Sequence, residues 1–385
     1  MFSNSSISSS EPARSFTTAM KRFWLRLALF LSPLVFMGLA ATLIGLSSGE
    51  LLPVRFVAWL QTRGEPFVFL PQFSDHTYRL KLDAVRRRRP EILALGSSRA
   101  NQWRSAMFRP TSFYNAANAV FVMRDFRRML EGFEDFAPRV IIFSVDYFTF
   151  LPAFEFVYRK QSKDDLGGWG SSEQVDILEG VLGEVMRDPK LLFHVRNGGV
   201  PTIGLYARKT GVGFRLDGSY HYGDRESADA ETVIPAIREG KQWPVSPAAN
   251  LDDARIQEFE RFTELARSKG IALVGVTMPF VPGVARVMEQ SPLYGAWRQF
   301  HSRQTQDWIR KQGVIYFDFT ALDSFGGRPD EFADPFHPSE PAYVRMLLTM
   351  LANENFRALV PHLDAEALRD RLKRASTLEA YGQEF

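Results

Sequence analysis

Three residues of this 385-residue chain are of the types that serine-dependent acyl chemistry requires. Ser98 lies in the motif GSSR (96–99), directly after a short apolar run, and Asp334 and His337 belong to the motif DPFHP (334–338). A serine hydroxyl becomes a good nucleophile when an imidazole takes its proton, and the imidazole needs an orienting carboxylate. We therefore assign Ser98 as the candidate nucleophile, His337 as the base and Asp334 as the orienting acid.

Both motifs also have a plain structural interpretation. One of the two serines at 97 and 98 would serve as the N-cap of the helix that follows the strand. The motif DPFHP would then be only a structural turn.

Other chemistries find little support in the sequence. The chain has no cysteine, which excludes disulfides, zinc–thiolate sites and cysteine nucleophiles. It has no Walker loop, no GxGxxG after a strand and no HExxH motif. We therefore expect neither a metal nor a cofactor. The remaining histidines are scattered singly, without metal-ligand spacing: His76, His194, His221, His301 and His362.

Composition limits the class of protein. Apolar residues make up 45% of the chain, enough for a large hydrophobic core. Lysine and arginine (47) nearly balance aspartate and glutamate (44), so the net charge is only +3. This balance gives no electrostatic argument for nucleic-acid binding.

Apolar strands that alternate with amphipathic helices must position the three residues. The strands are apolar throughout, as expected for strands buried on both faces, and helices separate them. This pattern predicts an α/β fold with a parallel sheet covered on both sides. In such sheets the ligand site lies at the carboxyl ends of the strands, where Ser98 would lie. We predict strands at 91–96, 112–115, 139–147, 271–277 and 314–318, and helices at about 122–136, 251–269, 294–312 and 339–352.

An N-terminal apolar run predicts a membrane anchor. Residues 27–46 carry no charge and would span about 30 Å as a helix, the thickness of a bilayer core. Basic residues precede the run, so the positive-inside rule predicts a cytoplasmic tail at 1–22, a transmembrane anchor at 23–46 and an extracytoplasmic remainder. A cleaved signal peptide and a buried soluble helix are the two alternatives.

The rest of the chain divides into three further parts. Residues 47–90 form a connecting region that ends in an arginine run at 86–89, either a solvated helix end or a site for an anionic lipid or polymer. The main domain covers 91–352, and within it 148–250 breaks the pattern and is expected to be an insertion that forms a lid or substrate surface. Residues 353–385 are predicted to be a helical tail.

Taken together, the GSSR and DPFHP motifs resemble the SGNH hydrolase superfamily, which comprises GDSL-like esterases and acyltransferases. In that family the nucleophile motif follows the first strand and an Asp-x-x-His motif lies in the last block. The resemblance covers roughly residues 90–352 and implies a three-layer α/β/α, flavodoxin-like sheet. The GSSR variant is similar to the membrane-anchored members that act in alginate O-acetylation and teichoic-acid D-alanylation.

The resemblance also implies an oxyanion hole, built from a backbone N–H and an asparagine side chain. At the end of the second strand, Ala117 and Asn118 are the positions that would supply them. The Gly-x-Asn-Asp block that the family carries after its third strand is replaced by Ser144-Val145-Asp146-Tyr147. Arg99 is a candidate contact for an anionic substrate, or it ties down the loop.

These features imply a function at the inner membrane, with the catalytic domain in the periplasm. The expected activity is that of a serine esterase or O-acyltransferase. It would hydrolyse an acyl ester or O-acetylate a cell-surface polysaccharide. A membrane-bound O-acyltransferase would be its partner, and the lipid bilayer would hold its N-terminal helix. The alternative is a non-catalytic accessory or polymer-binding protein of the same fold.

Overall fold

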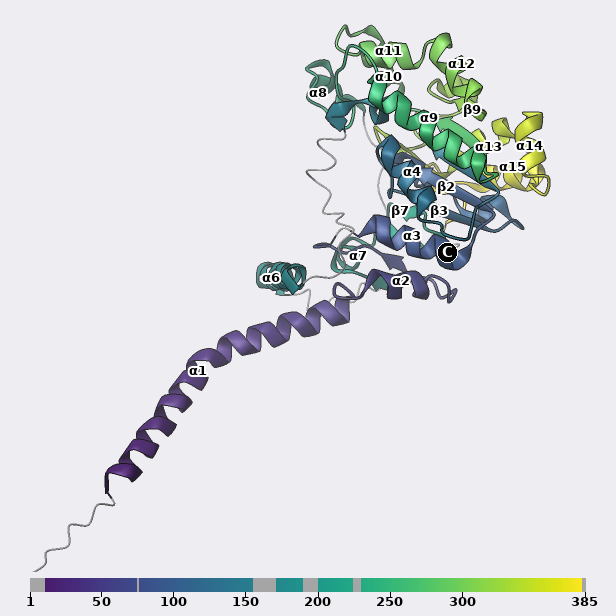
Figure 1. The fold of residues 1–385 in the computed structure, drawn as a ribbon. Helices are drawn as coiled ribbons and strands as arrows, with labels where there is room; N and C mark the ends of the chain where they lie inside the picture. The colour runs from purple at the N-terminus through teal and green to yellow at the C-terminus, as the bar shows by residue number, and fades with distance from the viewer. Residues whose placement is uncertain (1–10, 75, 155–170, 190–199, 224–229, 383–385) are drawn as a thin grey trace, which may run out of the picture.

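A five-stranded parallel sheet organises the main part of the molecule (Figure 1). The computed structural model describes residues 11–74, 76–154, 171–189, 200–223 and 230–382. All four strand pairings of the sheet are parallel, and the strands lie in the order β3-β2-β4-β8-β9. The strands are β2 (Ile92–Gly96), β3 (Phe113–Ala117), β4 (Val140–Ser144), β8 (Ala272–Thr277) and β9 (Val314–Asp318).

The strand order defines where a ligand site belongs. Numbered along the chain, the five strands follow the doubly wound order 2-1-3-4-5. The chain moves from β2 to β3 on one side and then crosses to β4 on the other, so the order reverses at β2. In such sheets ligands bind outside the carboxyl ends of the strands at this reversal.

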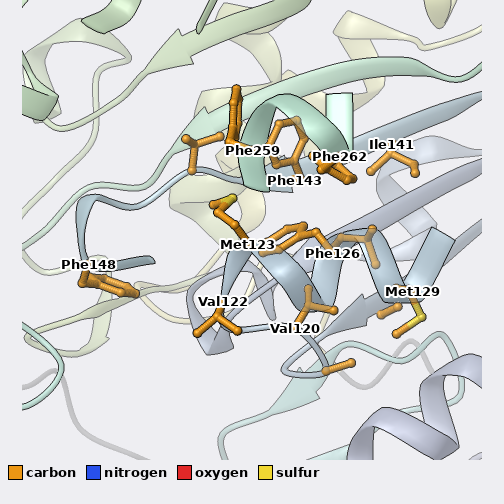
Figure 2. Close-up of a cluster of buried hydrophobic side chains, with 14 of the residues drawn as sticks. Val120, Val122, Met123, Phe126, Met129, Ile141, Phe143, Phe148, Phe259 and Phe262 are labelled. Carbon is orange, nitrogen blue, oxygen red and sulfur yellow. The ribbon is translucent and has the colours of Figure 1, made fainter. Parts of the chain in front are cut away.

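One face of the sheet packs against α3 (Thr77–Arg88), α4 (Met123–Glu131) and α9 (Asp253–Ser268). Figure 2 shows part of this core, in which aromatic rings from α4 and α9 meet strand β4. The Phe126 ring lies 5.5 Å from that of Phe262 and 6.0 Å from that of Phe143, in edge-to-face arrangements. Such contacts add to the burial of large apolar area, so this face is a well-defined core.

The opposite face of the sheet has its own hydrophobic cluster. Alternate strand residues, among them Ile92, Ile142 and Val274, contribute to it, because successive side chains of a strand point to opposite faces. The covering helices are α13 (Glu340–Met350), α14 (Glu354–Leu359) and α15 (Ala365–Arg374). The predicted α/β fold with a parallel sheet is therefore confirmed.

Further helices connect the strands and differ in detail from the prediction. The helix expected over 294–312 is two helices, α11 (Gly295–Phe300) and α12 (Arg303–Lys311). The break lies at Ser302, whose side chain accepts a hydrogen bond from the Thr305 N–H and so caps α12. The remaining elements here are α10 (Pro282–Gln290), β10 (Phe332–Asp334), β11 (His337–Pro338) and the 3₁₀ turns η1 (Ser98–Ala100), η2 (Ser105–Phe108), η3 (Tyr147–Phe150) and η6 (Leu322–Ser324).

A second, four-stranded sheet joins the connecting region to the insertion. Strand β1 pairs in parallel with β5 and antiparallel with β6, so the two segments that were expected to be separate form one structure. Its strands are β1 (Val68–Phe69), β5 (Thr202–Ile203), β6 (Gly213–Phe214) and β7 (Tyr220–His221). The helices beside it are α2 (Val54–Leu60), α6 (Ser171–Arg187) and α7 (Leu205–Thr210), followed by η5 (Ala230–Thr232) and α8 (Ile234–Arg238). Residues 155–170, 190–199 and 224–229 of the insertion lie outside the described residues.

The N-terminal helix α1 (Glu11–Ser48) extends away from the rest of the molecule (Figure 1). Its segment Thr18–Ser48 is long enough and apolar enough to cross a membrane, and little of it is buried. Large apolar side chains such as Phe30 and Phe36 are more than 70% exposed. An apolar N-terminal helix compatible with a membrane anchor is therefore present, as expected.

Candidate active site

The turn after β2 presents Ser98 at the carboxyl edge of the sheet. Gly96 ends the strand at φ +147°, a conformation that favours glycine, and a Cβ there would lie 2.1 Å from the hydroxyl oxygen of Ser144. Ser97 then caps the 3₁₀ turn η1, its hydroxyl accepting a hydrogen bond of 3.3 Å from the Arg99 N–H. The two serines thus differ: Ser97 is the cap, and the Ser98 hydroxyl is left to face the site.

Asp334 and His337 are brought together by a short antiparallel turn. Strands β10 and β11 pair Asp334 with His337 across it. One carboxylate oxygen of Asp334 accepts backbone hydrogen bonds from Phe336 at 2.9 Å and from His337 at 3.1 Å. These bonds fix the carboxylate on the inner side of the turn, next to the imidazole.

A continuous chain of hydrogen bonds joins the three side chains. Nδ1 of His337 lies 2.7 Å from the Asp334 carboxylate, and Nε2 lies 2.7 Å from the Ser98 hydroxyl oxygen. With Asp334 ionised, Nδ1–H donates to the carboxylate, which leaves Nε2 to accept the Ser98 proton. This is the arrangement in which imidazole acts as a general base on a serine.

The carboxylate of Asp334 is held in its charged form. Burial by itself would raise its pKa, but His337 and the two backbone N–H groups outweigh that effect, so the pKa lies below its ordinary value. Asp334 is therefore ionised throughout the neutral range. An ionised carboxylate stabilises the imidazolium that forms when His337 takes a proton.

Arg99 and Asp146 form a buried ion pair close to Ser98, the candidate nucleophile. Both side chains are 1% exposed, and their charged atoms lie 3.3 Å apart. Arg99 also donates to the carbonyl oxygens of Met278 at 2.6 Å and Pro279 at 2.8 Å, and its guanidinium lies 3.5 Å above the Phe280 ring. Arg99, a predicted candidate for substrate contact, thus ties the η1 turn to the loop after β8.

Asp146, two residues after the end of β4, is a residue of this site to which the sequence assigned no role. Burial raises its pKa, while Arg99 and His337 oppose that shift. Its position after the third main strand was visible in the sequence, where it stands in place of the family's asparagine block. Nothing in the sequence, however, indicated that it pairs with Arg99.

Two backbone groups at the expected oxyanion hole are already occupied. The Ala117 N–H donates to the side-chain oxygen of Asn115 at 2.8 Å, and the Asn118 N–H donates to the Gly96 carbonyl at 2.8 Å. Two donors remain without a hydrogen-bond partner among the described residues: the Asn118 carboxamide and the Ser98 N–H. They would have to stabilise an oxyanion here, in place of the expected Ala117 N–H.

Tyr222, from the insertion, packs beside the candidate base. Its ring centroid lies 5.8 Å from that of His337, with the ring planes at 43°. Burial raises the pKa of Tyr222 well above its ordinary value, so it stays neutral. No sequence pattern indicates this contact, apart from the expectation that 148–250 forms a lid or substrate surface.

A buried charge network fastens this part of the insertion to the main sheet. Glu340, at the start of α13, pairs with Arg104 and, at 3.3 Å, with Arg215 of the insertion. Arg104 also pairs with Asp217 at 3.3 Å. The second oxygen of Glu340 accepts N–H groups of Ala380 and Tyr381, near the C-terminus. The network therefore fixes the strand β7, which leads into Tyr222, relative to the candidate site.

No cluster of three or more histidine, cysteine, aspartate or glutamate side chains that could hold a metal ion is found in the described part of the chain. Comparison of the chain with models of protein families, with curated proteins and with solved structures finds no match in any of the three. The functional interpretation therefore rests on the geometry of the site itself.

Proposed function

We propose that the protein is a serine esterase or O-acyltransferase whose nucleophile is Ser98. The observation that carries this proposal is the unbroken chain of 2.7 Å contacts from the Ser98 hydroxyl through His337 to Asp334. A structural serine does not need an imidazole backed by a carboxylate. The position at the carboxyl end of β2, where the strand order reverses, supports the same interpretation.

The reaction follows from the roles of the three side chains. The Ser98 oxygen attacks the ester carbonyl while His337 takes its proton, and a tetrahedral oxyanion forms. His337 then gives that proton to the departing alkoxide, which leaves an acyl group on Ser98. In the second half, His337 deprotonates an incoming hydroxyl, which attacks the acyl-serine and releases Ser98 with its proton restored.

The acceptor of the second half decides between the two activities. Water gives an esterase, and a sugar hydroxyl gives an O-acyltransferase. The resemblance to membrane-anchored SGNH proteins and the apolar helix α1 support acylation of a cell-surface polysaccharide on the outer side of the inner membrane. In this proposal a membrane-bound O-acyltransferase is the partner that supplies the acyl group.

Adjacent serines provide a matched test. Ser98→Ala should reduce hydrolysis of p-nitrophenyl acetate to the background rate without changing the melting temperature. Ser97→Ala should keep most of the activity and lower stability by about 1 kcal/mol, because it loses the cap but keeps the nucleophile. Full activity of Ser98→Ala would rule out Ser98 as the nucleophile.

A non-catalytic, polymer-binding accessory protein is the second candidate. The occupied Ala117 N–H favours it, since it removes a donor expected of the oxyanion hole. This alternative predicts that polysaccharide binding is the same in wild type and Ser98→Ala, and that neither protein forms an acyl-serine. A serine-acylated peptide recovered from the wild type would contradict it.

A further inference from the structure

A pocket rich in arginine lies at the amino ends of the main strands, opposite the carboxyl ends where Ser98 lies. Its volume is about 360 Å³. Residues at the end of α3, just after α2 and at the start of β3 contribute to its lining. Phe113, which begins β3, is part of its wall, whereas Ala117 ends β3 on the side of the candidate active site. A five-residue strand spans on the order of 15 Å, so the pocket and the active site are separate.

The charges of the pocket are all of one sign. Arg87, Arg88 and Arg109 contribute to its lining, and no described lining residue is acidic. Most of the other lining residues carry hydroxyl groups, including Thr62 and Thr111. Guanidinium groups offer forked N–H donors that match the oxygens of a phosphate, and hydroxyls add further donors.

The two arginines of α3 that line the pocket, Arg87 and Arg88, form no ion pair with a described residue. Arg88 donates to the carbonyl oxygen of Leu216 at 2.9 Å and to that of Gln61, and carbonyls leave its charge uncompensated. Its Nε is buried and forms no hydrogen bond among the described residues. Arg87 is exposed and makes neither an ion pair nor a hydrogen bond with a described residue. Like charges that line one pocket repel each other, and an anion bound between them would relieve that repulsion.

Helix α2 connects the pocket to the apolar helix along the chain. Thr62 follows α2, and α2 begins soon after α1 ends. On α2, Phe56 is 42% exposed and stacks on Trp59, and Arg63 lies 4.3 Å above the Trp59 ring. Aromatic rings with an adjacent arginine are typical of the interface between a bilayer and water.

From this combination we propose that the pocket binds a phosphate group. The phosphate belongs either to a lipid headgroup or to a soluble phosphate compound, since both present the same oxygens. The proposal is independent of the function of Ser98. It also gives Arg87 and Arg88, two of the four arginines in the run at 86–89, a role beyond that of a solvated helix end.

Thermal unfolding of the full-length protein in a maltoside detergent tests the proposal. Inorganic phosphate and short-chain phosphatidylglycerol are titrated separately, each against acetate at equal ionic strength, because a ligand that binds the folded state raises the melting temperature saturably. The charge-reversed Arg87→Glu should weaken the response roughly tenfold or more, as expected for the loss of a charged hydrogen bond. Arg303→Glu is the matched control, because the Arg303 side chain is 96% exposed on the distant helix α12.

The outcomes separate the two sources of phosphate. A saturable response to both ligands supports a site for the phosphate group itself, and a response to the lipid alone assigns the site to a headgroup. No saturable response to either ligand would overturn the proposal. So would an equal response to acetate, or an Arg87→Glu variant that responds like the wild type.

Discussion

At the scale of single residues, the candidate site depends on the hydrogen bonds that fix His337. The imidazole is held on one side by Asp334 and faces Ser98 on the other, so its tautomer and its orientation are set by the same carboxylate. The carboxylate in turn is fixed by the N–H groups of Phe336 and His337. Each member therefore has a partner that restricts it before any substrate binds.

Asp334→Asn isolates the role of this carboxylate. The amide keeps the size of the side chain and can accept the two backbone bonds, but it no longer stabilises a charged imidazole. We expect ester hydrolysis to fall by roughly 10²–10⁴-fold, with kcat affected more than KM. Steady-state kinetics measure this, and a variant with kcat unchanged would contradict the assigned role.

The same variant has a defined pH dependence. Because the pKa of Asp334 is lowered in the folded protein, its contribution to stability is present above the unfolded value of about 3.9 and is lost as the pH falls through the folded value. The difference in melting temperature between wild type and Asp334→Asn should shrink as the pH falls below about 4, where Asp334 becomes protonated. A difference that grows below pH 4 would mean that the pKa of Asp334 is raised instead.

At the scale of elements, the end of β2 leads from a buried strand to the half-buried Ser98, the candidate nucleophile. The strand is apolar on both faces, and the backbone leaves the sheet at Gly96 in a conformation that few other residues adopt. The hydroxyl of Ser144 on β4 lies where a side chain at position 96 would point. The turn, and with it the position of Ser98, therefore depends on close packing between two neighbouring strands.

Gly96→Ala tests this dependence, with Gly270→Ala as its control. Both glycines have positive φ, but a Cβ at position 270 meets nothing within 4 Å, whereas one at 96 meets the hydroxyl of Ser144. We expect Gly270→Ala to cost about 1 kcal/mol and to keep activity, and Gly96→Ala to cost more and to lose most activity. Denaturant unfolding and hydrolysis rates measure both, and equal effects would contradict the packing argument.

The sequence predicted the elements whose residue patterns are long. Each of the five main strands lies within three residues of its predicted bounds, because a run such as VIIF buried on both faces has few other structures available. The second sheet was not predicted, since strands of two residues, such as β1 and β5, carry no periodicity. The capture of the Ala117 N–H by Asn115 depends on one side-chain rotamer, and no sequence pattern indicates it.

At the scale of the whole molecule, the chain combines an exposed apolar helix with a well-packed α/β unit. The carboxylate of Glu50 links the two, because it accepts backbone N–H groups from Gln72, Phe73 and Leu205 just after α1 ends. The buried carboxylate of Glu340 acts in a similar way between α13, the insertion and the C-terminal segment. The Glu50 contacts hold the end of α1, from which the helix extends away from the rest of the molecule (Figure 1).

Charged substitutions in α1 test whether it holds the protein in a membrane. Leu34→Arg combined with Leu39→Arg places two charges where each costs about 3 kcal/mol for insertion. The full-length variant should appear in the soluble fraction after an alkaline wash of membranes. The wild type and the matched Leu34→Ala, Leu39→Ala variant should stay in the pellet. Retention of the arginine variant would contradict a membrane anchor.

Covalent labelling of Ser98 tests the central claim most directly. A fluorophosphonate forms a bond only with a serine whose hydroxyl is activated, and peptide mass spectrometry identifies the modified residue. We predict modification of the wild type at Ser98 alone, with none in Ser98→Ala and at least a hundredfold slower labelling in His337→Ala. An unlabelled wild type, or labelling of Ser98 at the same rate without His337, would contradict the account.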